Sequence, residues 1–344
     1  MNILIFGNGT LFVGDQEKKI CSSIAELGHK VYLVSHGNVS KFETSYEEKN
    51  NFEILNIPNY NHKLLNIDHS SIDFVLGIDQ SVAPFVAEYK RIYSKPSYCI
   101  FLDLPLHVID GTDAVNYNFN YAQRFYYWIN CALELDNIIF INQYVANKFE
   151  EIYKRKPLVI NFAVTEDFGD IQEEKSDYIS SCGSLVPYKG MSLLIDALRR
   201  LPYSWKHITA SDVVQFKKHV EIILKDRVEI LHKLGDREKM IVMSCSKIFV
   251  YPQISEWMGG LVPIEAMSVH TPVVCFDYPI FRELYEDSVL YAKKKSILDL
   301  RAKINLLYDD KDLYKEMQNR GYELFKRRYT RKTMSKNLIN IFCK

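Results

Sequence analysis

The sequence lacks a long uncharged hydrophobic run. None of its apolar stretches approaches the roughly 18 residues that a membrane-spanning helix requires. The first residues, MNILIF, enter a strand-like run at once, without the basic segment and cleavage site of a signal peptide. We therefore expect a cytoplasmic protein with no transmembrane helix.

Patterns typical of disulfides and metal sites are also missing. The seven cysteines include no CxxC pair, and their number is odd. The acidic cluster Asp309, Asp310 and Asp312 falls in a polar, late helical stretch rather than between a strand and a helix. No His/Cys cluster has the spacing of metal ligands. We expect buried free thiols, a reducing compartment and no metal site.

Charge does not point to a nucleic-acid binder. Basic and acidic side chains number 43 each, so the net charge is zero. Residues 1–150 carry 11 basic against 17 acidic side chains, whereas the remainder carries 32 against 26. An anionic ligand is therefore more favourably placed on the C-terminal half.

The 344 residues correspond to about two domains at roughly 150 residues each. Apolar runs alternate with helical periodicity in both halves, which predicts parallel sheets wound on both faces by helices. The polar, acidic segment 165–177 predicts a linker. The expected fold class is α/β, with two doubly wound, Rossmann-like parallel-sheet domains over residues 1–164 and 178–325 that face a central cleft. The expected strands are 2–6, 31–34, 72–78, 98–102, 138–141, 178–182, 228–231, 247–251 and 272–276.

Three glycines follow the first expected strand. Gly7, Gly9 and Gly14 do not form the GxGxxG pattern, because the third glycine comes two residues too late. The second strand ends at Ser35 without the carboxylate that a dinucleotide ribose needs. Dinucleotide binding is therefore disfavoured. The glycines make a tight turn, or they let a ligand approach the backbone.

Two segments of the C-terminal half suit phosphate chemistry. In 183–190, GSLVPYKG, Lys189 lies beside a helix start and suits a diphosphate, although an exposed turn lysine is the alternative. In 252–267, PQISEWMGGLVPIEAM, two glycines precede a helix, whose free amides can bind phosphate. Glu265 suits a ribose diol and Glu256 suits sugar hydroxyls. Alternatively, Glu265 is a favourable acid near a helix N-terminus.

These segments resemble a known family. Residues 256–274 resemble the C-terminal signature of the retaining glycosyltransferase family 4 (glycosyl transferases group 1), P-S-x-x-E-G-F-G-L-x-x-x-E-A-M-x-x-G-x-P-V-V. Residues 183–190 resemble its G-R-L-x-x-x-K-G, and ELGHKVYLV at 26–34 resembles its L-x-x-x-G-H-x-V. The resemblance spans nearly the whole chain. It implies the GT-B fold, in which the C-terminal helix, residues 326–344, completes the first domain.

The resemblance implies transfer of a sugar from a UDP- or GDP-linked donor to a glycan, lipid or other hydroxyl acceptor. Transfer retains the anomeric configuration and needs no metal or other cofactor. Lys189 would bind the diphosphate, Glu265 the ribose and Glu256 the donor sugar, while the loop at Gly14 would close over the phosphates. The other implied donor-binding positions are Gly183, Ser184, Gly259, Gly260 and Leu261.

The sequence departs from the family pattern at several donor-side positions. Ser184 replaces the diphosphate arginine, and His270 replaces the glycine before the P-V-V segment. The spacing from Glu256 to Glu265 is one residue longer than E-x7-E. Segment 210–212, Ala-Ser-Asp, replaces a G-x-G. Lys189 is therefore expected to carry most of the side-chain charge that faces the diphosphate.

The first domain departs at its usual histidine, whose place Leu102 occupies. Asp103 or His107 is expected to substitute, which makes them catalytic candidates together with Glu256. For His107 the alternative is an ordinary loop histidine.

Two further segments leave alternatives open. The aromatic segment 117–128 either belongs to the core or docks a lipid or glycan acceptor. Segment 322–336 carries six basic side chains against Glu323, and either contacts anionic lipid at the inner membrane face or is a solvated helix start. Alternatives to an active transferase are a non-catalytic GT-B protein that binds nucleotide sugars or serves as a partner subunit, and a sugar-nucleotide epimerase, which the E-A-M segment disfavours.

Overall fold

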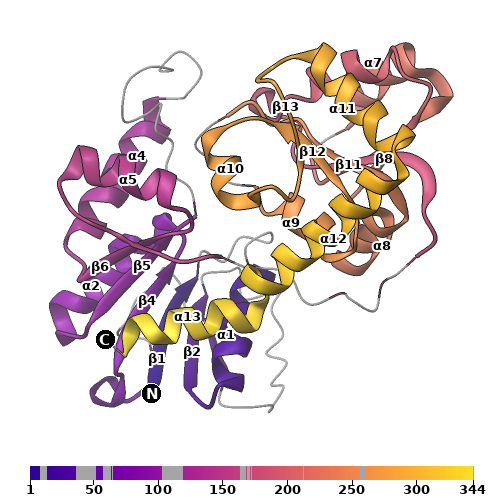
Figure 1. The fold of residues 1–344 in the computed structure, drawn as a ribbon. Coiled ribbons are helices and arrows are strands. Elements are labelled where there is room, and N and C mark those ends of the chain that lie inside the picture. The colour runs from indigo at the N-terminus through magenta and orange to yellow at the C-terminus, as the bar shows by residue number, and fades with distance from the viewer. Residues whose placement is uncertain are drawn as a thin grey trace. The chain divides into compact units, whose positions relative to one another are not determined.

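The computed structural model describes residues 1–7, 14–35, 52–56, 63, 65–102, 119–162, 168, 171, 173–211, 213–255 and 260–343 (Figure 1). Contacts divide the chain into two compact units. Unit 1 consists of residues 1–164 and 331–344, and unit 2 consists of residues 165–330. The chain thus returns to unit 1 at Arg331, a few residues after the expected return, and segment 165–177 is grouped with unit 2.

Unit 1 contains, within its described part, a seven-stranded sheet in the order β3-β2-β1-β4-β5-β6-β7. All pairings between these described strands are parallel, as the alternation of strands and helices predicts. Residues 3–6 of the central β1 are fully buried, as expected for a strand covered on both faces. The strands are β1 (Asn2–Gly7), β2 (Lys30–Ser35), β3 (Phe52–Asn56), β4 (Phe74–Ile78), β5 (Ser97–Phe101), β6 (Asn137–Phe140) and β7 (Leu158–Val159).

The helices of unit 1 include the C-terminal one. The α13 helix packs along α1, and the Phe342 ring lies 4.0 Å from the Phe74 ring of β4 between centroids (Figure 1). The end of the chain is therefore part of the unit in which the chain begins. The helices are α1 (Gly14–Glu26), α2 (Ala83–Tyr93), α4 (Phe119–Leu133), α5 (Gln143–Tyr153) and α13 (Arg331–Phe342), with short 3₁₀ turns η3 (His69–Ser71) and η4 (Gln80–Val82).

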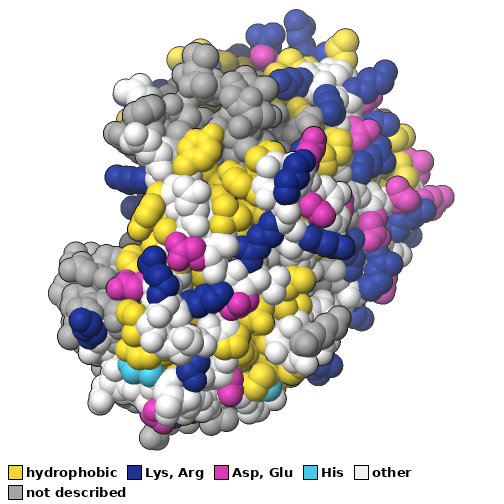
Figure 2. All heavy atoms as spheres, turned by 90° about the vertical axis from the view of Figure 1, so that its left-hand side faces the viewer, with side chains coloured by type: hydrophobic (Ala, Val, Ile, Leu, Met, Phe, Trp, Pro, Cys, Tyr) yellow, Lys and Arg dark blue, Asp and Glu magenta, His cyan; other side chains and the backbone are white. Residues whose placement is uncertain are grey.

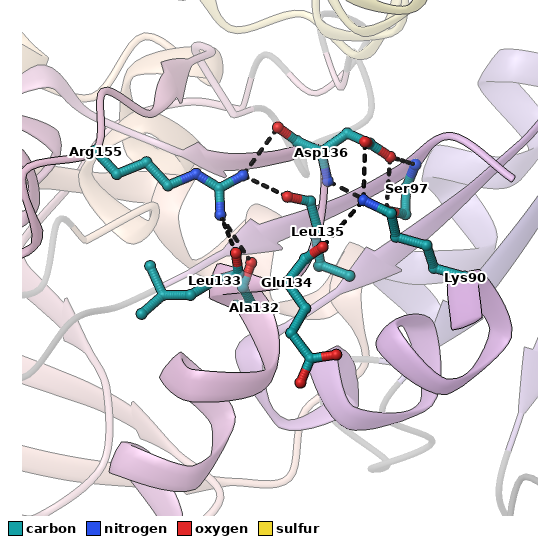
Figure 3. A network of polar contacts seen from close by, with 8 residues as sticks. All are labelled: Lys90, Ser97, Ala132, Leu133, Glu134, Leu135, Asp136 and Arg155. Atoms are coloured by element: carbon teal, nitrogen blue, oxygen red, sulfur yellow. Dashed lines mark hydrogen bonds and ion pairs between the residues drawn. The ribbon is translucent and has the colours of Figure 1, made fainter. Parts of the chain in front are cut away.

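Two basic side chains hold the C-terminus of α4 (Figure 3). Arg155, which follows α5, donates to the carbonyl oxygens of Leu133 at 2.6 Å and of Asp136 at 2.9 Å, and also to those of Ala132 and Leu135. Lys90 of α2 donates to the carbonyl of Glu134 at 3.0 Å and to the Asp136 carboxylate at 2.8 Å. The last carbonyls of a helix have no partner within it, so these cations supply partners and attach α4 to its neighbours.

Unit 2 contains, among its described residues, a six-stranded sheet in the order β10-β9-β8-β11-β12-β13, again with parallel pairing throughout. Two parallel sheets confirm the expected α/β class. The strands are β8 (Ser176–Cys182), β9 (Ser204–Thr209), β10 (Val228–His232), β11 (Ser246–Tyr251), β12 (Val273–Phe276) and β13 (Leu290–Ala292).

Helices α6 to α10 connect successive strands of unit 2, and α11 and α12 follow the last strand, β13. One connection contains His270, whose φ of 54° lies in the left-handed region that favours glycine. Its ring stacks on Tyr322 at 3.8 Å between centroids, which helps to hold a non-glycine residue there. The helices are α6 (Met191–Leu198), α7 (Val214–Leu224), α8 (Asp236–Cys245), α9 (Val262–Ser268), α10 (Pro279–Tyr285), α11 (Ile297–Asp309) and α12 (Lys311–Arg328), with 3₁₀ turns η5 (Pro187–Lys189) and η6 (Lys225–Arg227).

Arg155→Ala is expected to lower the free energy of unfolding of unit 1 by about 2 kcal/mol, because several carbonyls lose a charged donor. Urea denaturation followed by circular dichroism measures the change. Lys156→Ala, at the exposed neighbouring position, is the control and is expected to stay within about 0.5 kcal/mol of the unmodified protein. Equal stability of the two variants would show that the capping of α4 contributes little.

Candidate functional site

The loops that follow β8 and β11 meet at one edge of the second sheet. These strands are paired in parallel, so their carboxyl ends lie side by side. The Ile254 N–H donates to the Tyr188 carbonyl at 2.9 Å, which joins the two loops. Gly190 has a φ of 67°, and a Cβ atom there would lie 2.0 Å from the Pro252 carbonyl oxygen. Only glycine permits this approach, so segments 183–190 and 252–255 form one surface.

Lys189 is anchored on that surface. Its Nζ donates to Gln253 Oε1 at 2.8 Å, and the Tyr251 hydroxyl donates to the same oxygen at 2.5 Å. The Nζ also lies 5.5 Å from the Tyr188 ring centroid and 5.7 Å from that of Tyr251. Lys189 is half-buried rather than a free turn lysine. This burial does not fit an exposed turn lysine, and the binding of a diphosphate by Lys189 stays a prediction.

Glu265 lies in α9 and is 92% buried, since 8% of its surface is exposed. Its Oε1 accepts a hydrogen bond from Lys239 Nζ at 2.9 Å. Its Oε2 is also buried, and no residue in the described part of the chain donates to it. One carboxylate oxygen is therefore engaged by a cation, while the other has acceptor capacity that these residues do not use.

Lys239 of α8 is a site residue that sequence reasoning did not identify. Its side chain is 19% exposed, and its Nζ also lies 3.5 Å from Asp236. Burial lowers the pKa of Lys239, but the carboxylate of Glu265 outweighs burial and raises that pKa above its ordinary value. Lys239 is thus a charged partner of Glu265. No motif marks it, because the pairing joins residues of two different helices.

Cys182, the last residue of β8, lies among these charged groups. Burial and, secondarily, Glu265 raise the pKa of the Cys182 thiol to about 12, while Lys239 and Lys189 act in the opposite direction. The thiol therefore stays protonated at neutral pH. Because Lys189, Lys239 and Glu265 all act on this one atom, the three charged side chains share one neighbourhood at the end of β8.

Gly260 and Leu261 border the same neighbourhood. The Gly260 carbonyl accepts a hydrogen bond from the Tyr285 hydroxyl at 2.6 Å, and a Cβ atom on Gly260 would lie 2.1 Å from the Tyr251 hydroxyl. Leu261 is the half-buried N-cap of α9. The close approach of Tyr251 therefore requires a glycine at position 260, independently of any ligand that the Gly260 amide binds.

The remaining candidates divide into two groups. Gly183 and Ser184 directly follow β8, and both are half-buried; Gly183 has a φ of 150°. Ser184 contributes no charge at the position where the family pattern has an arginine. Asp103, His107, Glu256 and Gly259 lie outside the described residues, so their sequence-based roles stay predictions.

In unit 1, Gly14 begins α1. Gly7, at the end of β1, packs against the buried Glu17, since a Cβ atom on Gly7 would lie 2.2 Å from Glu17 Oε2. A larger residue at position 7 would therefore clash with the Glu17 side chain of α1.

The described residues also contain no group of three or more His, Cys, Asp or Glu side chains arranged to hold a metal ion.

The aromatic segment 117–128 contributes to both core and surface. In its described part, Phe125 is fully buried, whereas Tyr126 and Tyr127 are 43% and 58% exposed. Ile92 of the neighbouring α2 is also exposed. Figure 2 faces this side of unit 1 and shows hydrophobic side chains interspersed with basic and acidic ones. Phe125 therefore belongs to the core, as one alternative has it, whereas docking of an acceptor at the exposed tyrosines stays a prediction.

Part of the charge in the basic segment 322–336 is used inside unit 2. Arg327 and Arg328 both pair with Glu286, the latter at 2.7 Å. These contacts connect α12 with Glu286, the residue after α10.

No helix among the described residues combines the length and the hydrophobicity needed to cross a membrane.

The sequence is similar to those of known glycosyltransferases. Residues 163–324 match the family model described as "Glycosyl transferases group 1". An uncharacterised glycosyltransferase of Methanocaldococcus jannaschii is 27% identical over 250 residues, covering 68% of this chain and 69% of that protein. The O-antigen chain mannosyltransferase RfbU of Salmonella typhimurium is 31% identical over 125 residues, covering 35% of each chain.

Solved structures show the same fold over the whole chain. Sucrose-phosphate synthase from Thermosynechococcus elongatus matches with a TM-score of 0.80 at 13% identity, covering 100% of this chain and 98% of that one. HepE from Anabaena, in complex with UDP-glucose, matches with a TM-score of 0.76 at 17% identity, covering 100% and 99%. At these identities the likeness concerns the fold alone.

Gly190→Ala is expected to lower the free energy of unfolding of unit 2 by about 2 kcal/mol or more. The new methyl group meets the Pro252 carbonyl, and a left-handed backbone is itself unfavourable for alanine. Gly235→Ala is the matched control, because its φ is −66° and the nearest atom to its Cβ is 3.5 Å away. Urea denaturation compares the two. An equal effect would argue against a tight contact at Gly190.

Proposed function

We propose that this protein, a glycosyltransferase of the GT-B fold whose residues 163–324 belong to the glycosyl transferases group 1 family, takes its sugar from a nucleoside diphosphate donor. The donor is UDP- or GDP-linked, and the acceptor is a hydroxyl group of a glycan or lipid-linked molecule. One observation carries the proposal. A placed cation, Lys189, and a buried carboxylate with an unused oxygen, Glu265, share one sheet edge in unit 2.

Each side chain suits a different part of such a donor. Lys189 presents an ammonium to the diphosphate, and Glu265 Oε2 accepts from a ribose hydroxyl. Lys239 is neutralised by Glu265 and Asp236, so it adds little net charge toward phosphate. Lys189 therefore replaces the absent arginine at position 184 as the main charge. We further assign phosphate or sugar contacts to the amides of Gly259, Gly260 and Leu261, and sugar hydroxyl contacts to Glu256.

The reaction we propose retains the anomeric configuration. The bond from the anomeric carbon to the diphosphate breaks, the acceptor oxygen bonds to that carbon on the same face, and the acceptor proton passes to the departing diphosphate. Charge develops on the diphosphate, where Lys189 and preorganised backbone amides stabilise it without a metal ion. Asp103 and His107 are assigned to the acceptor side, where they position the hydroxyl group. The loop at Gly14 is assigned to closing over the phosphates, which excludes water.

Two relatives bear on the donor, and they point in different directions. One is named as a mannosyltransferase, and one solved structure holds UDP-glucose. Both uridine and guanosine donors therefore stay in the proposal. The aromatic surface of α4, with Tyr126 and Tyr127 exposed, is the surface of unit 1 that we assign to peripheral contact with a lipid-linked acceptor.

Donor hydrolysis in the absence of added acceptor tests the proposal. The protein is incubated with UDP-glucose, UDP-N-acetylglucosamine, GDP-mannose, ADP-glucose and dTDP-glucose in EDTA, and the released nucleotide is quantified. Slow release from one uridine or guanosine donor is expected, with a thermal shift for the matching nucleotide. Thermal stabilisation without any release, also when acceptor glycans are added, would indicate a binding protein. Release that EDTA abolishes and Mn²⁺ or Mg²⁺ restores would contradict the metal-free mechanism.

Lys189→Ala is expected to raise the dissociation constant of the preferred nucleoside diphosphate more than tenfold, about 1.4 kcal/mol or more. The nucleoside without phosphates is expected to bind both proteins equally. Lys206→Ala is the control, because Lys206 is a half-buried lysine of unit 2 that pairs with Glu229 at 3.0 Å. Isothermal titration calorimetry measures the constants. Unchanged diphosphate affinity in Lys189→Ala would place the phosphates elsewhere.

A further inference from the structure

Lys239 occupies a position that helix formation alone does not favour. It lies in the first turns of α8, where the partial positive charge of the helix N-terminus repels a cation. The start of that helix is already secured, because Glu238 accepts from the Gly235 N–H at 2.9 Å. Asp236 lies 3.5 Å from Lys239, which reduces the cost without requiring a lysine. The reason for the lysine therefore lies outside α8.

The side chain of Lys239 points from α8 to α9. Its Nζ reaches Glu265 Oε1 at 2.9 Å, and the two side chains are only 19% and 11% exposed. A short contact between buried charges holds both groups in one orientation, since either group leaves an unpaired charge if it moves. The Glu265 carboxylate thus cannot rotate freely about its last bond.

Stability is a weak explanation for this pair. Removing two charges from water is costly, and apolar residues of similar volume often replace buried ion pairs without loss of stability. The pair also satisfies only half of the carboxylate, because no described residue donates to the buried Oε2. A pair selected for stability alone would have both oxygens satisfied.

We infer that Lys239 is a positioning residue for donor recognition: it fixes Glu265 with Oε1 engaged, so that Oε2 accepts a hydrogen bond from a ribose hydroxyl of the donor nucleotide. The inference rests on the proposed function. It also narrows the expectation that Glu265 accepts from a ribose diol to one of its two carboxylate oxygens. With Oε1 engaged by Lys239, recognition of the ribose depends on the direction in which Oε2 is held.

The consequence is a specificity effect. A carboxylate held in one direction discriminates between a ribose that offers a hydroxyl and one that lacks it, because the buried oxygen is otherwise left unsatisfied. Without Lys239 the carboxylate can turn, and Oε2 loses its fixed direction. Discrimination against the deoxy nucleotide should then fall, whereas contacts to the diphosphate through Lys189 should be unaffected.

The test compares binding of the preferred nucleoside diphosphate with that of its 2′-deoxy and 3′-deoxy analogues by titration calorimetry. The unmodified protein is expected to bind at least one analogue more than tenfold more weakly. Lys239→Met is expected to reduce that ratio to below about threefold, mainly by weakening the ribonucleotide. Lys239→Arg should restore most of the ratio. Lys217→Met, which breaks the exposed pair with Glu221 on α7, should leave it unchanged.

Two comparisons keep the outcomes distinct. If Lys239→Met fails to fold, Lys239→Gln, whose neutral side chain is one bond shorter than lysine and does not reach Glu265 Oε1, is expected to show the same reduced ratio. An unchanged ratio in a folded Lys239 variant overturns the inference, and so does an equal loss of affinity for all three nucleotides, which indicates a merely structural role. If the unmodified protein binds no nucleoside diphosphate, the proposed function fails. If Glu265→Gln removes the discrimination and Lys239→Met does not, only the inference fails.

Discussion

The arrangement of unit 2 at the edge where the loops after β8 and β11 meet depends on the close contact between Gly190 and the Pro252 carbonyl. A side chain at position 190 would push apart the two loops that follow β8 and β11. With glycine, Ile254 can reach Tyr188, and Lys189 lies within hydrogen-bonding distance of Gln253. The cation is therefore placed by backbone packing before any ligand binds, which reduces the ordering cost of binding.

Two of the charges at this edge, those of Glu265 and Lys239, offset each other. Glu265 would oppose an anionic ligand if it were unpaired, but Lys239 neutralises it at 2.9 Å. Lys189 donates to the side-chain amide oxygen of Gln253 and lies near the rings of Tyr188 and Tyr251, which fix its position. The same neighbourhood thus offers a cation and a hydrogen-bond acceptor without strong repulsion of a diphosphate.

In unit 1, side chains from neighbouring elements hold the C-terminal end of α4. The carbonyls at the end of α4 lack partners within that helix, and Arg155 and Lys90 supply them from neighbouring segments (Figure 3). The contacts connect α4 with α2 and α5, so the exposed Tyr126 and Tyr127 stand on a fixed helix. Arg155 and Lys90 therefore hold the helix that carries the exposed tyrosines of unit 1. In unit 2, the contact between Gly190 and Pro252 holds the loop that carries Lys189.

Local pattern determined the alternation of strands and helices, because strands buried on both faces are short apolar runs, whereas helices with one buried face show a period of about 3.6 residues. It also marked Lys189 and Glu265, which lie in short motifs at the ends of strands. The strands β3, β7, β9 and β13 were not predicted from the sequence. In the edge strand β3, residues 52–55 are only half-buried, and the charged Glu53 interrupts the apolar run. Only the tertiary structure decided the partners of Glu265 and of the α4 terminus. Lys239 and Arg155 reach across from other elements, and such contacts leave no periodic trace in the sequence, since their geometry arises when the helices pack.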